Sequence, residues 1–226
     1  MAMLVFDFDG VLHDSRERAW RCYRQARTEM ELGALPDLAG PGDLPLVYRG
    51  VLSASLTRWV DFEVAERFCK RHAELTARAA ADEPHGLLPE LIGPLAGLAA
   101  GPGYAVVTGS HHTTVRTLLA RDLTEKAMPR ILLSRDEPGS KTDRLRDLRT
   151  RYGAGAYVGD TGSDVRHAHA AGLSAIAVAY GYASREDLAA AGPDRILATP
   201  ADLAAWCRAH TGARGVAPAP APSRAT

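Results

Sequence analysis

Apolar residues in this chain occur either in short continuous runs or at helical spacing, and the two patterns occupy different segments. Residues 4–8 form a short, partly β-prone apolar run that stops at Gly10. Such a run predicts a central strand that is buried on both faces. Residues 15–31 place apolar side chains at helical spacing, with Ser15 as the expected N-cap. A strand followed by a helix is therefore expected to open the fold.

The next part of the chain is expected to contain no strand. Residues 35–50 hold three prolines and three glycines, which is typical of a loop region. Residues 51–81 then resume a helical pattern that is broken near Val60. From Ser15 to about residue 85 the pattern predicts only helices and turns.

Beyond Gly86, short apolar runs alternate regularly with helical patterns. Alternating strands and helices of this length imply right-handed crossovers and a parallel sheet that helices cover on both sides. The predicted strands are residues 104–107, 131–133, 156–158 and 174–178, and the predicted helices are residues 89–99, 111–121, 141–152, 163–171, 184–190 and 200–209.

The composition excludes several classes of protein. The chain has 226 residues, of which 46% are hydrophobic and 24% charged, and its 27 basic residues balance its 27 acidic ones. This balance gives no reason to expect a nucleic acid or an anionic membrane as partner. Cys22, Cys69 and Cys207 show no C-x-x-C spacing, and no apolar run approaches the ~20 residues of a membrane span. We expect a cytoplasmic protein with reduced thiols.

Four polar residues follow predicted strands. Asp7, Thr108 and Asp160 each come at the carboxyl end of an apolar run, and Lys141 follows another strand after a short loop. Ligands of open parallel sheets bind at that edge, so these residues are expected to converge on one site.

Two carboxylates, Asp7 and Asp9, flank an aromatic residue just before a glycine. One reading makes one of them a nucleophile or metal ligand and the other a proton donor; the other reading is two exposed acids in a turn. An EF-hand calcium loop would also begin D-x-D, but it needs an oxygen ligand, a glycine and a glutamate where this chain has Val11, Leu12 and Arg18. The calcium loop is therefore excluded.

Two further acids, Asp160 and Asp164, follow a later strand. Asp164 falls in the first turn of the next predicted helix, where it could simply cap that helix. If Asp160 lies beside Asp7, however, the acids could not all stay ionised unless a cation sat among them. Mg²⁺ suits such a site because it prefers oxygen ligands and commonly bridges to phosphate.

Anion-binding groups are expected nearby. Thr108 and Gly109 offer a hydroxyl and backbone N–H groups where a helix begins. Lys141 sits near a helix start, which is unfavourable for a cation unless an anion lies opposite, although a solvated surface lysine is the commoner case. A nucleotide-binding P-loop is rejected, because it needs glycine where the chain has Ser140.

These segments together resemble the motifs of the haloacid dehalogenase-like hydrolase superfamily, on its phosphoglycolate phosphatase-like side. VFDFDGVLHDS is similar to the first motif, VVTGS to the second, Lys141 to the third and GDTGSDVRHAHAAG to the fourth. The likeness extends from Met3 to about Leu203. It implies an α/β fold with a Rossmann-like, doubly wound parallel sheet and an inserted α-helical cap domain.

The resemblance also implies roles for these residues. Asp7 would attack phosphorus, and Asp9 would protonate the leaving oxygen and later activate water. The ligands of Mg²⁺ would be Asp7, the backbone carbonyl of Asp9, and Asp160. Asp164 would support these ligands from outside the coordination sphere. The residues that would bind the phosphoryl oxygens are Thr108, Gly109 and Lys141.

Within the superfamily, an acidic residue at the position of Asp9 is typical of enzymes that hydrolyse phosphoesters and of phosphomutases. Beta-phosphoglucomutases share this acid, but their fourth motif typically reads E-D where this chain has Gly159 and Asp160. A phosphatase is therefore favoured, and a sugar phosphomutase is the alternative. One departure is Thr142, since the family usually carries proline after the lysine of the third motif.

The domain division expected from the resemblance is a core of residues 1–14 and 86–210, a helical cap of residues 15–85 and a disordered tail of residues 211–226. A cap leaves room for only a modest substrate, so the expected partner is a small phosphorylated metabolite. Arg49, in the central loop of the cap, is the candidate for binding an anionic group of that substrate. The chain is expected to be a monomer or a homodimer.

Overall fold

The centre of the molecule is a six-stranded, all-parallel sheet with the strand order β3-β2-β1-β4-β5-β6. The computed structural model describes residues 2–48, 51–83 and 86–211. Its strands are β1 (Met3–Phe6), β2 (Tyr104–Val107), β3 (Ile131–Leu133), β4 (Ala154–Gly159), β5 (Ser174–Val178) and β6 (Arg195–Leu197). The predicted Rossmann-like α/β class is confirmed, because this order is that of doubly wound sheets.

Strand β1 lies in the middle of the sheet, between strands β2 and β4. It pairs with β2 on one side and β4 on the other, so that Phe6 lies opposite both Val106 and Val158. The strand order reverses direction at this point, and in such sheets the crevice outside the carboxyl ends of the strands is the usual ligand site. Residues that follow β1, β2 and β4 therefore share one edge.

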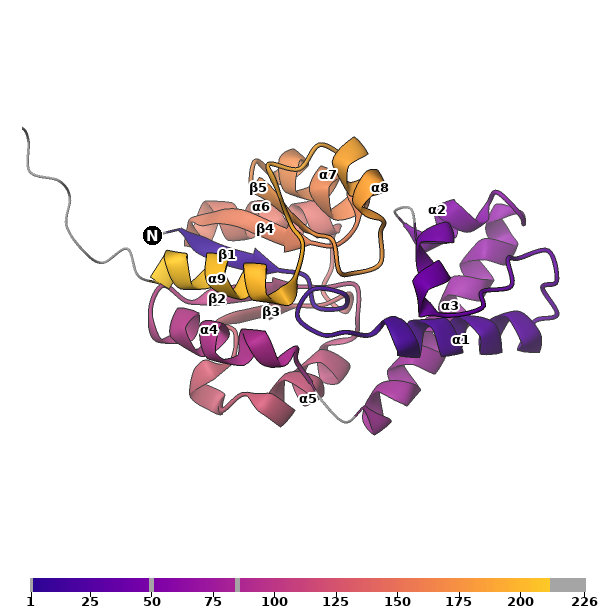
Figure 1. Cartoon of the computed structure of the whole chain (residues 1–226), viewed down its shortest axis with the longest axis horizontal. Helices are drawn as coiled ribbons and strands as arrows, with labels where there is room; N and C mark the ends of the chain where they lie inside the picture. Colours follow the sequence, from indigo (N-terminus) through magenta and orange to yellow (C-terminus); the bar gives the residue numbers. More distant parts are fainter. Residues whose placement is uncertain (1, 49–50, 84–85, 212–226) are drawn as a thin grey trace, which may run out of the picture.

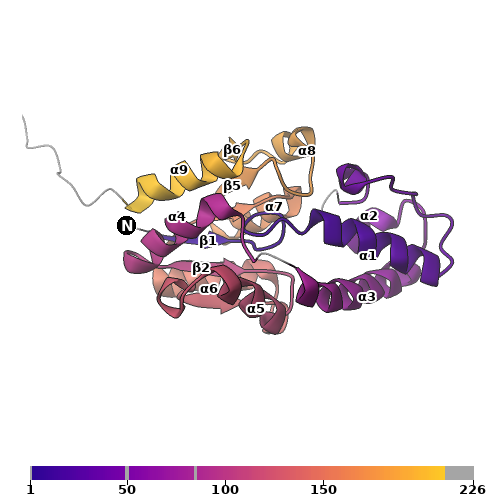
Figure 2. The ribbon, with the colours of Figure 1, turned by 60° about the horizontal axis from the view of Figure 1, so that its bottom comes forward.

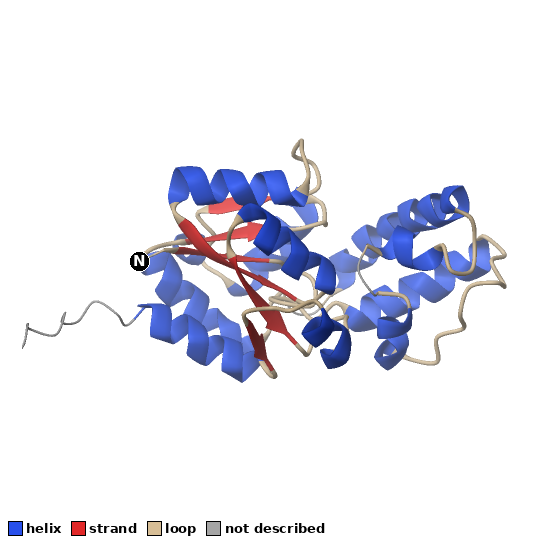
Figure 3. Cartoon of the chain, turned by 90° about the horizontal axis from the view of Figure 1, so that it is seen from above, coloured by secondary structure: helices blue, strands red, loops and turns tan. Residues whose placement is uncertain are grey.

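The two faces of the sheet are covered by different helices (Figure 3). Because side chains alternate along a strand, Leu4 and Phe6 of β1 join one hydrophobic cluster, whereas Met3 and Val5 join another. The first cluster is covered by α4 (Pro89–Ala100), α5 (His112–Asp122) and α9 (Pro200–Thr211), and the second by α6 (Lys141–Tyr152), α7 (Gly162–Ala171) and α8 (Arg185–Ala190).

A group of helices beside the sheet forms a lobe of its own (Figures 1 and 2). It has a separate hydrophobic cluster, in which the rings of Tyr23 and Phe68 meet edge to face at 5.2 Å. The lobe contains α1 (Arg16–Glu29), η1 (Pro41–Leu46), α2 (Leu52–Leu56), α3 (Phe62–Ala79) and η2 (Ala80–Asp82). We call it the helical segment. The expected absence of strands holds for its described residues, and the helical pattern breaks between α2 and α3 as predicted.

Three details differ from the sequence-based expectation. Strand β1 ends at Phe6, so Phe8 lies in the following turn, where it is nevertheless fully buried. The loop predicted for residues 35–50 contains a short 3-10 helix, η1. Ser15 does precede α1, but its hydroxyl forms a hydrogen bond with Tyr182 (2.7 Å) and makes no capping bond.

Strand β6 was not predicted at all. Unlike the equally short β3, which is entirely apolar, β6 begins with the exposed Arg195 and so forms no continuous apolar run; it lies at the edge of the sheet and pairs with β5. The tail predicted to be disordered, apart from residue 211 at its start, lies outside the described residues, as does Arg49. In the part of the chain that is described, no helix is long and apolar enough to cross a membrane.

Candidate active site

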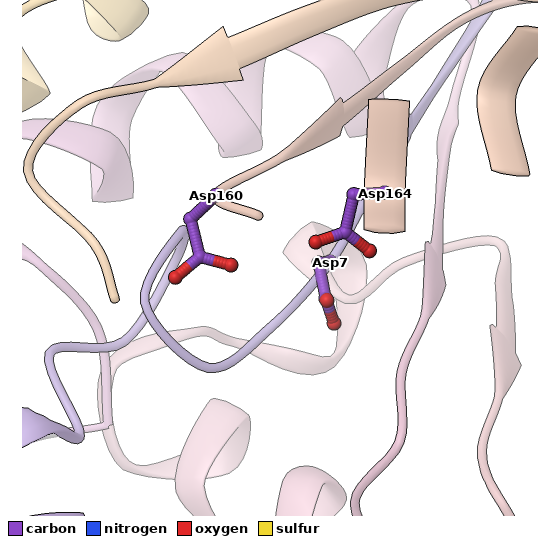
Figure 4. Close-up of side chains that lie close together, drawn as sticks. All are labelled: Asp7, Asp160 and Asp164. Atoms are coloured by element: carbon purple, nitrogen blue, oxygen red, sulfur yellow. The ribbon is translucent and has the colours of Figure 1, made fainter. Parts of the chain in front are cut away.

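Three buried carboxylates meet at the carboxyl edge of the sheet (Figure 4). Asp7 follows β1, Asp160 follows β4, and Asp164 lies in the first turn of α7. Each offers an oxygen atom, and these atoms lie within 4.8 Å of one another. The convergence expected from the strand ends is therefore present, over a separation of more than 150 positions in the sequence.

Lys141 completes this cluster. Ser140 caps α6 by accepting a hydrogen bond from a backbone N–H, and Lys141 is the first residue of that helix. Its Nζ lies 2.8 Å from Asp7 Oδ2 and 2.9 Å from Asp164 Oδ1, and 5.6 Å from the ring centroid of Tyr157. Burial opposes the charge, yet the two carboxylates raise the pKa of Lys141 well above its ordinary value. The cation at the helix start is explained by these anions.

The three acids differ in how well their charge is supported. Burial, with Asp164 and Asp7 nearby, raises the pKa of Asp160 well above its ordinary value. Burial also raises the pKa of Asp7 to about 6, although Lys141 acts in the opposite direction. Burial opposes the charge of Asp164 as well, but Lys141 and a hydrogen bond from Thr161 hold its pKa below its ordinary value. Asp160 therefore has the greatest need for a further positive charge.

Glycines allow the backbone to approach these acids closely. A Cβ on Gly10, where φ is +75°, would lie 2.0 Å from Asp160 Oδ2, and one on Gly181 would lie 2.3 Å from the same atom. A Cβ on Gly159 would lie 2.2 Å from the Cβ of Asp164. Any side chain at these three positions would therefore displace an acid.

The carboxylate of Asp9 is held from two sides. Its Oδ1 accepts a hydrogen bond from Arg18 of α1 (2.8 Å), and its Oδ2 accepts one from the Ser110 hydroxyl (2.5 Å). The sequence predicts that Asp9 belongs to the site, but it predicts neither of these hydrogen bonds. Nothing in the position of Arg18 along the sequence signals its contact with Asp9, because the contact depends on how α1 is oriented relative to the sheet.

The predicted phosphate-binding residues line the same site. Thr108 is buried after β2, where its N–H donates to Leu133 and its hydroxyl accepts from the Ser110 N–H (3.1 Å). Gly109 is exposed, and no atom lies within 4 Å of where its Cβ would be. An anion could therefore approach the backbone at Gly109 without steric hindrance.

The model of the haloacid dehalogenase-like hydrolases matches residues 4–178, which include all four acids and Lys141. The chain belongs to the haloacid dehalogenase-like hydrolases. The family resemblance predicted from the motifs is thereby confirmed.

Relatives of this haloacid dehalogenase-like hydrolase include a curated phosphoglycolate phosphatase from Synechococcus elongatus. The two are 46% identical over 68 residues, which make up 28% of this chain and 32% of the relative. A family hydrolase from Streptococcus pneumoniae has a similar structure, with a TM-score of 0.73 at 17% identity over 91% of this chain and 98% of the other. The structure of a predicted phosphoglycolate phosphatase from Haemophilus somnus gives a TM-score of 0.69 at 21% identity, over 90% of this chain and 96% of the other. These structures support the fold.

A cavity of about 500 Å³ lies over the acids of this hydrolase, and both lobes line it. Asp7 and Lys141 lie on the sheet side, and Tyr48 and His72 on the side of the helical segment. The ring of Tyr48 packs 4.7 Å from that of Tyr182, which comes from the loop after β5. The cavity therefore places the buried acids under a wall of mostly neutral polar and aromatic side chains, to which Arg18 adds a positive charge.

Proposed function

We propose that this protein is a magnesium-dependent phosphatase that hydrolyses a small phosphomonoester through an aspartyl-phosphate on Asp7. The observation that carries the proposal is the position of the Asp7 carboxylate. Its Oδ2 accepts from Lys141, its Oδ1 accepts from the Phe8 N–H (2.7 Å), and a second acid, Asp9, follows two residues later on the same cavity wall. A fixed carboxylate beside a proton donor suits nucleophilic attack on a phosphate ester.

The residues fit a divalent cation. Asp7, Asp160 and Asp164 are balanced, among the described residues, by the single ammonium of Lys141. Three carboxylates against one ammonium leave two negative charges, and buried acids cannot keep such a balance without a counter-charge. Mg²⁺ would be held by Asp7, the backbone carbonyl of Asp9 and Asp160, with Asp164 supporting them. When bound, it would neutralise these acids and the transferring phosphoryl group.

In the first proposed step, an Oδ atom of Asp7 attacks phosphorus and the bond from phosphorus to the ester oxygen breaks. Asp9 gives its proton to that oxygen, so the alcohol leaves and an aspartyl-phosphate remains. In the second step, Asp9 takes a proton from water as the water oxygen attacks phosphorus, and the bond from phosphorus to Asp7 breaks. Inorganic phosphate leaves, and both acids return to their starting state.

The remaining residues serve binding in this proposal. Thr108, the backbone N–H of Gly109 and Lys141 bind the phosphoryl oxygens, which makes catalysis largely a matter of position and charge. The helical segment acts as a cap that excludes water and limits substrate size. The size of the cavity and the phosphoglycolate phosphatase among the relatives support a small phosphorylated metabolite as substrate.

The test is phosphate release from a panel of phosphorylated metabolites, with Mg²⁺ and with the metal chelated. We expect release that depends on Mg²⁺ and that Asp7→Asn lowers by about 10³-fold or more. Asp14→Asn is the matched control, since Asp14 is an exposed acid of the same loop that pairs with Arg16. No release from any compound, or undiminished release by Asp7→Asn, would refute the proposal. A sugar phosphomutase would instead release little phosphate and require a bisphosphate activator.

A further inference from the structure

Arg18 is a buried cation that crosses from the helical segment to the sheet. It lies in the first turn of α1, its side chain is only 4% exposed, and its Nη2 lies 2.8 Å from Asp9 Oδ1. Exposed arginines are common, but an arginine this buried is found where it is paired. Its principal partner is the acid to which we assign proton transfer.

The same guanidinium also contacts both places where the chain passes between the two lobes. Nη1 lies 3.0 Å from His13 Nε2, just before α1 begins, and 3.5 Å from Glu83 Oε1, just after η2 ends. The His13 ring in turn stacks on Phe8, between the two acids of the first motif. Any shift of α1 relative to the sheet therefore moves Arg18 relative to these crossing points and to Asp9.

Asp9 is thus held by one group from each lobe. Arg18 binds one oxygen from the helical segment, and Ser110 binds the other from the end of β2. The orientation of the carboxylate then depends on how the two lobes are placed. Arg18 reaches its partners through its two terminal nitrogens, and within the described residues its buried Nε has no partner. A lysine, with one nitrogen, could not reproduce these contacts.

We propose that Arg18 is a positioning residue that orients Asp9 for proton transfer and couples this orientation to the placement of the helical segment. The inference rests on the proposed function, because it concerns the donor of the leaving-group proton. Arg18 itself transfers no proton and touches no reacting atom. It sets the direction in which Asp9 presents its carboxyl group.

The test compares two leaving groups. Alkyl phosphates need protonation of the leaving oxygen, whereas 4-nitrophenyl phosphate releases a stable phenolate without it. The ratio kcat/KM reports steps up to formation of the aspartyl-phosphate, so it isolates the first proton transfer. We expect Arg18→Met to lower kcat/KM by about 10- to 100-fold for the best alkyl substrate of the panel and by less than about threefold for 4-nitrophenyl phosphate.

Arg16→Met is the matched control, because Arg16 lies on the same helix turn but pairs with the exposed Asp14; it should leave both values unchanged. Arg18→Lys keeps the charge and is measured as well, with the same selective loss expected; it replaces Arg18→Met if that variant does not fold. An equal loss on both esters would overturn the inference while leaving the phosphatase proposal intact. Wild-type protein that hydrolyses neither ester would instead refute the proposed function.

Discussion

At the carboxyl edge of the sheet, three buried acids and the partly buried ammonium of Lys141 form one cluster; the acids are Asp7, Asp160 and Asp164. The helical segment also buries polar groups, but the Nε2–H of its His72 donates a single hydrogen bond to the backbone carbonyl of Ala19 (3.1 Å), and the rings of Tyr48 and Phe68 lie beside the imidazole. One region concentrates negative charge that needs compensation, whereas the other, apart from Arg18 at its junction with the sheet, buries neutral polar groups. Under the proposed function, this difference separates groups that act on a phosphate from groups that shape the space around it.

Among the changes that test this comparison of the two regions, the largest effect is expected from removing the compensating charge at the sheet edge. Lys141→Met would leave two buried carboxylates without their shared cation, and a preorganised charge of this kind contributes about 10²- to 10³-fold to kcat. Steady-state phosphate release measures this loss. Thermal unfolding of the variant should also depend more strongly on Mg²⁺ than that of the wild type.

Lys70→Met provides the matching substitution in the helical segment. Lys70 is an exposed residue of α3, so activity and Mg²⁺ dependence should not change. If the two lysine variants behaved alike, the contrast between the regions would be wrong.

The sheet edge could be predicted from the sequence because each of its residues sits in a local pattern. Short apolar runs predict strands, and parallel strands bring their ends to one edge. The sequence alone therefore predicts that Asp7 and Asp160 lie close together. The contact between Arg18 and Asp9 could not be predicted, since it depends on the angle between a helix and a sheet. Tyr182 likewise packs against Tyr48 through a contact between segments far apart in the chain.

A second prediction tests the neutral state of His72. Burial lowers the pKa of this side chain to about 4, against an ordinary value of 6.5. The unfolded chain therefore takes up a proton between these two pH values before the folded protein does. Above pH 6.5 the side chain is neutral in both states, and its titration does not reduce stability. As the pH falls toward 4, protonation of His72 in the unfolded chain lowers the free energy of unfolding by about 3 kcal/mol.

The measurement is the free energy of unfolding by urea at several pH values for wild type and His72→Gln. Because the comparison is a difference between two proteins, other titrating groups largely cancel. His169→Gln is the control: His169 is exposed on α7 and its pairing with Asp194 (3.4 Å) is exposed as well, so this substitution should change the pH dependence only slightly. An identical slope in wild type and His72→Gln would mean that the helical segment does not keep this histidine neutral.

The smallest expected effect concerns the backbone that lies next to the Asp160 carboxylate. A methyl group at Gly181 would fall 2.3 Å from Asp160 Oδ2, while the neighbouring Tyr182 N–H donates to that same oxygen (2.7 Å). The carboxylate must therefore shift, and a displacement of about 1 Å at a reacting centre can cost up to about 10²-fold in rate. We expect Gly181→Ala to lower kcat/KM by about 10- to 100-fold and to raise the Mg²⁺ concentration needed for half-maximal activity.

Gly93→Ala, on α4 where no atom lies within 4 Å of the new Cβ, should leave both values unchanged. Since neither variant alters a charge, a normal Mg²⁺ requirement in Gly181→Ala would show that the sheet edge depends on charge balance alone and not on the close fit of backbone to acid.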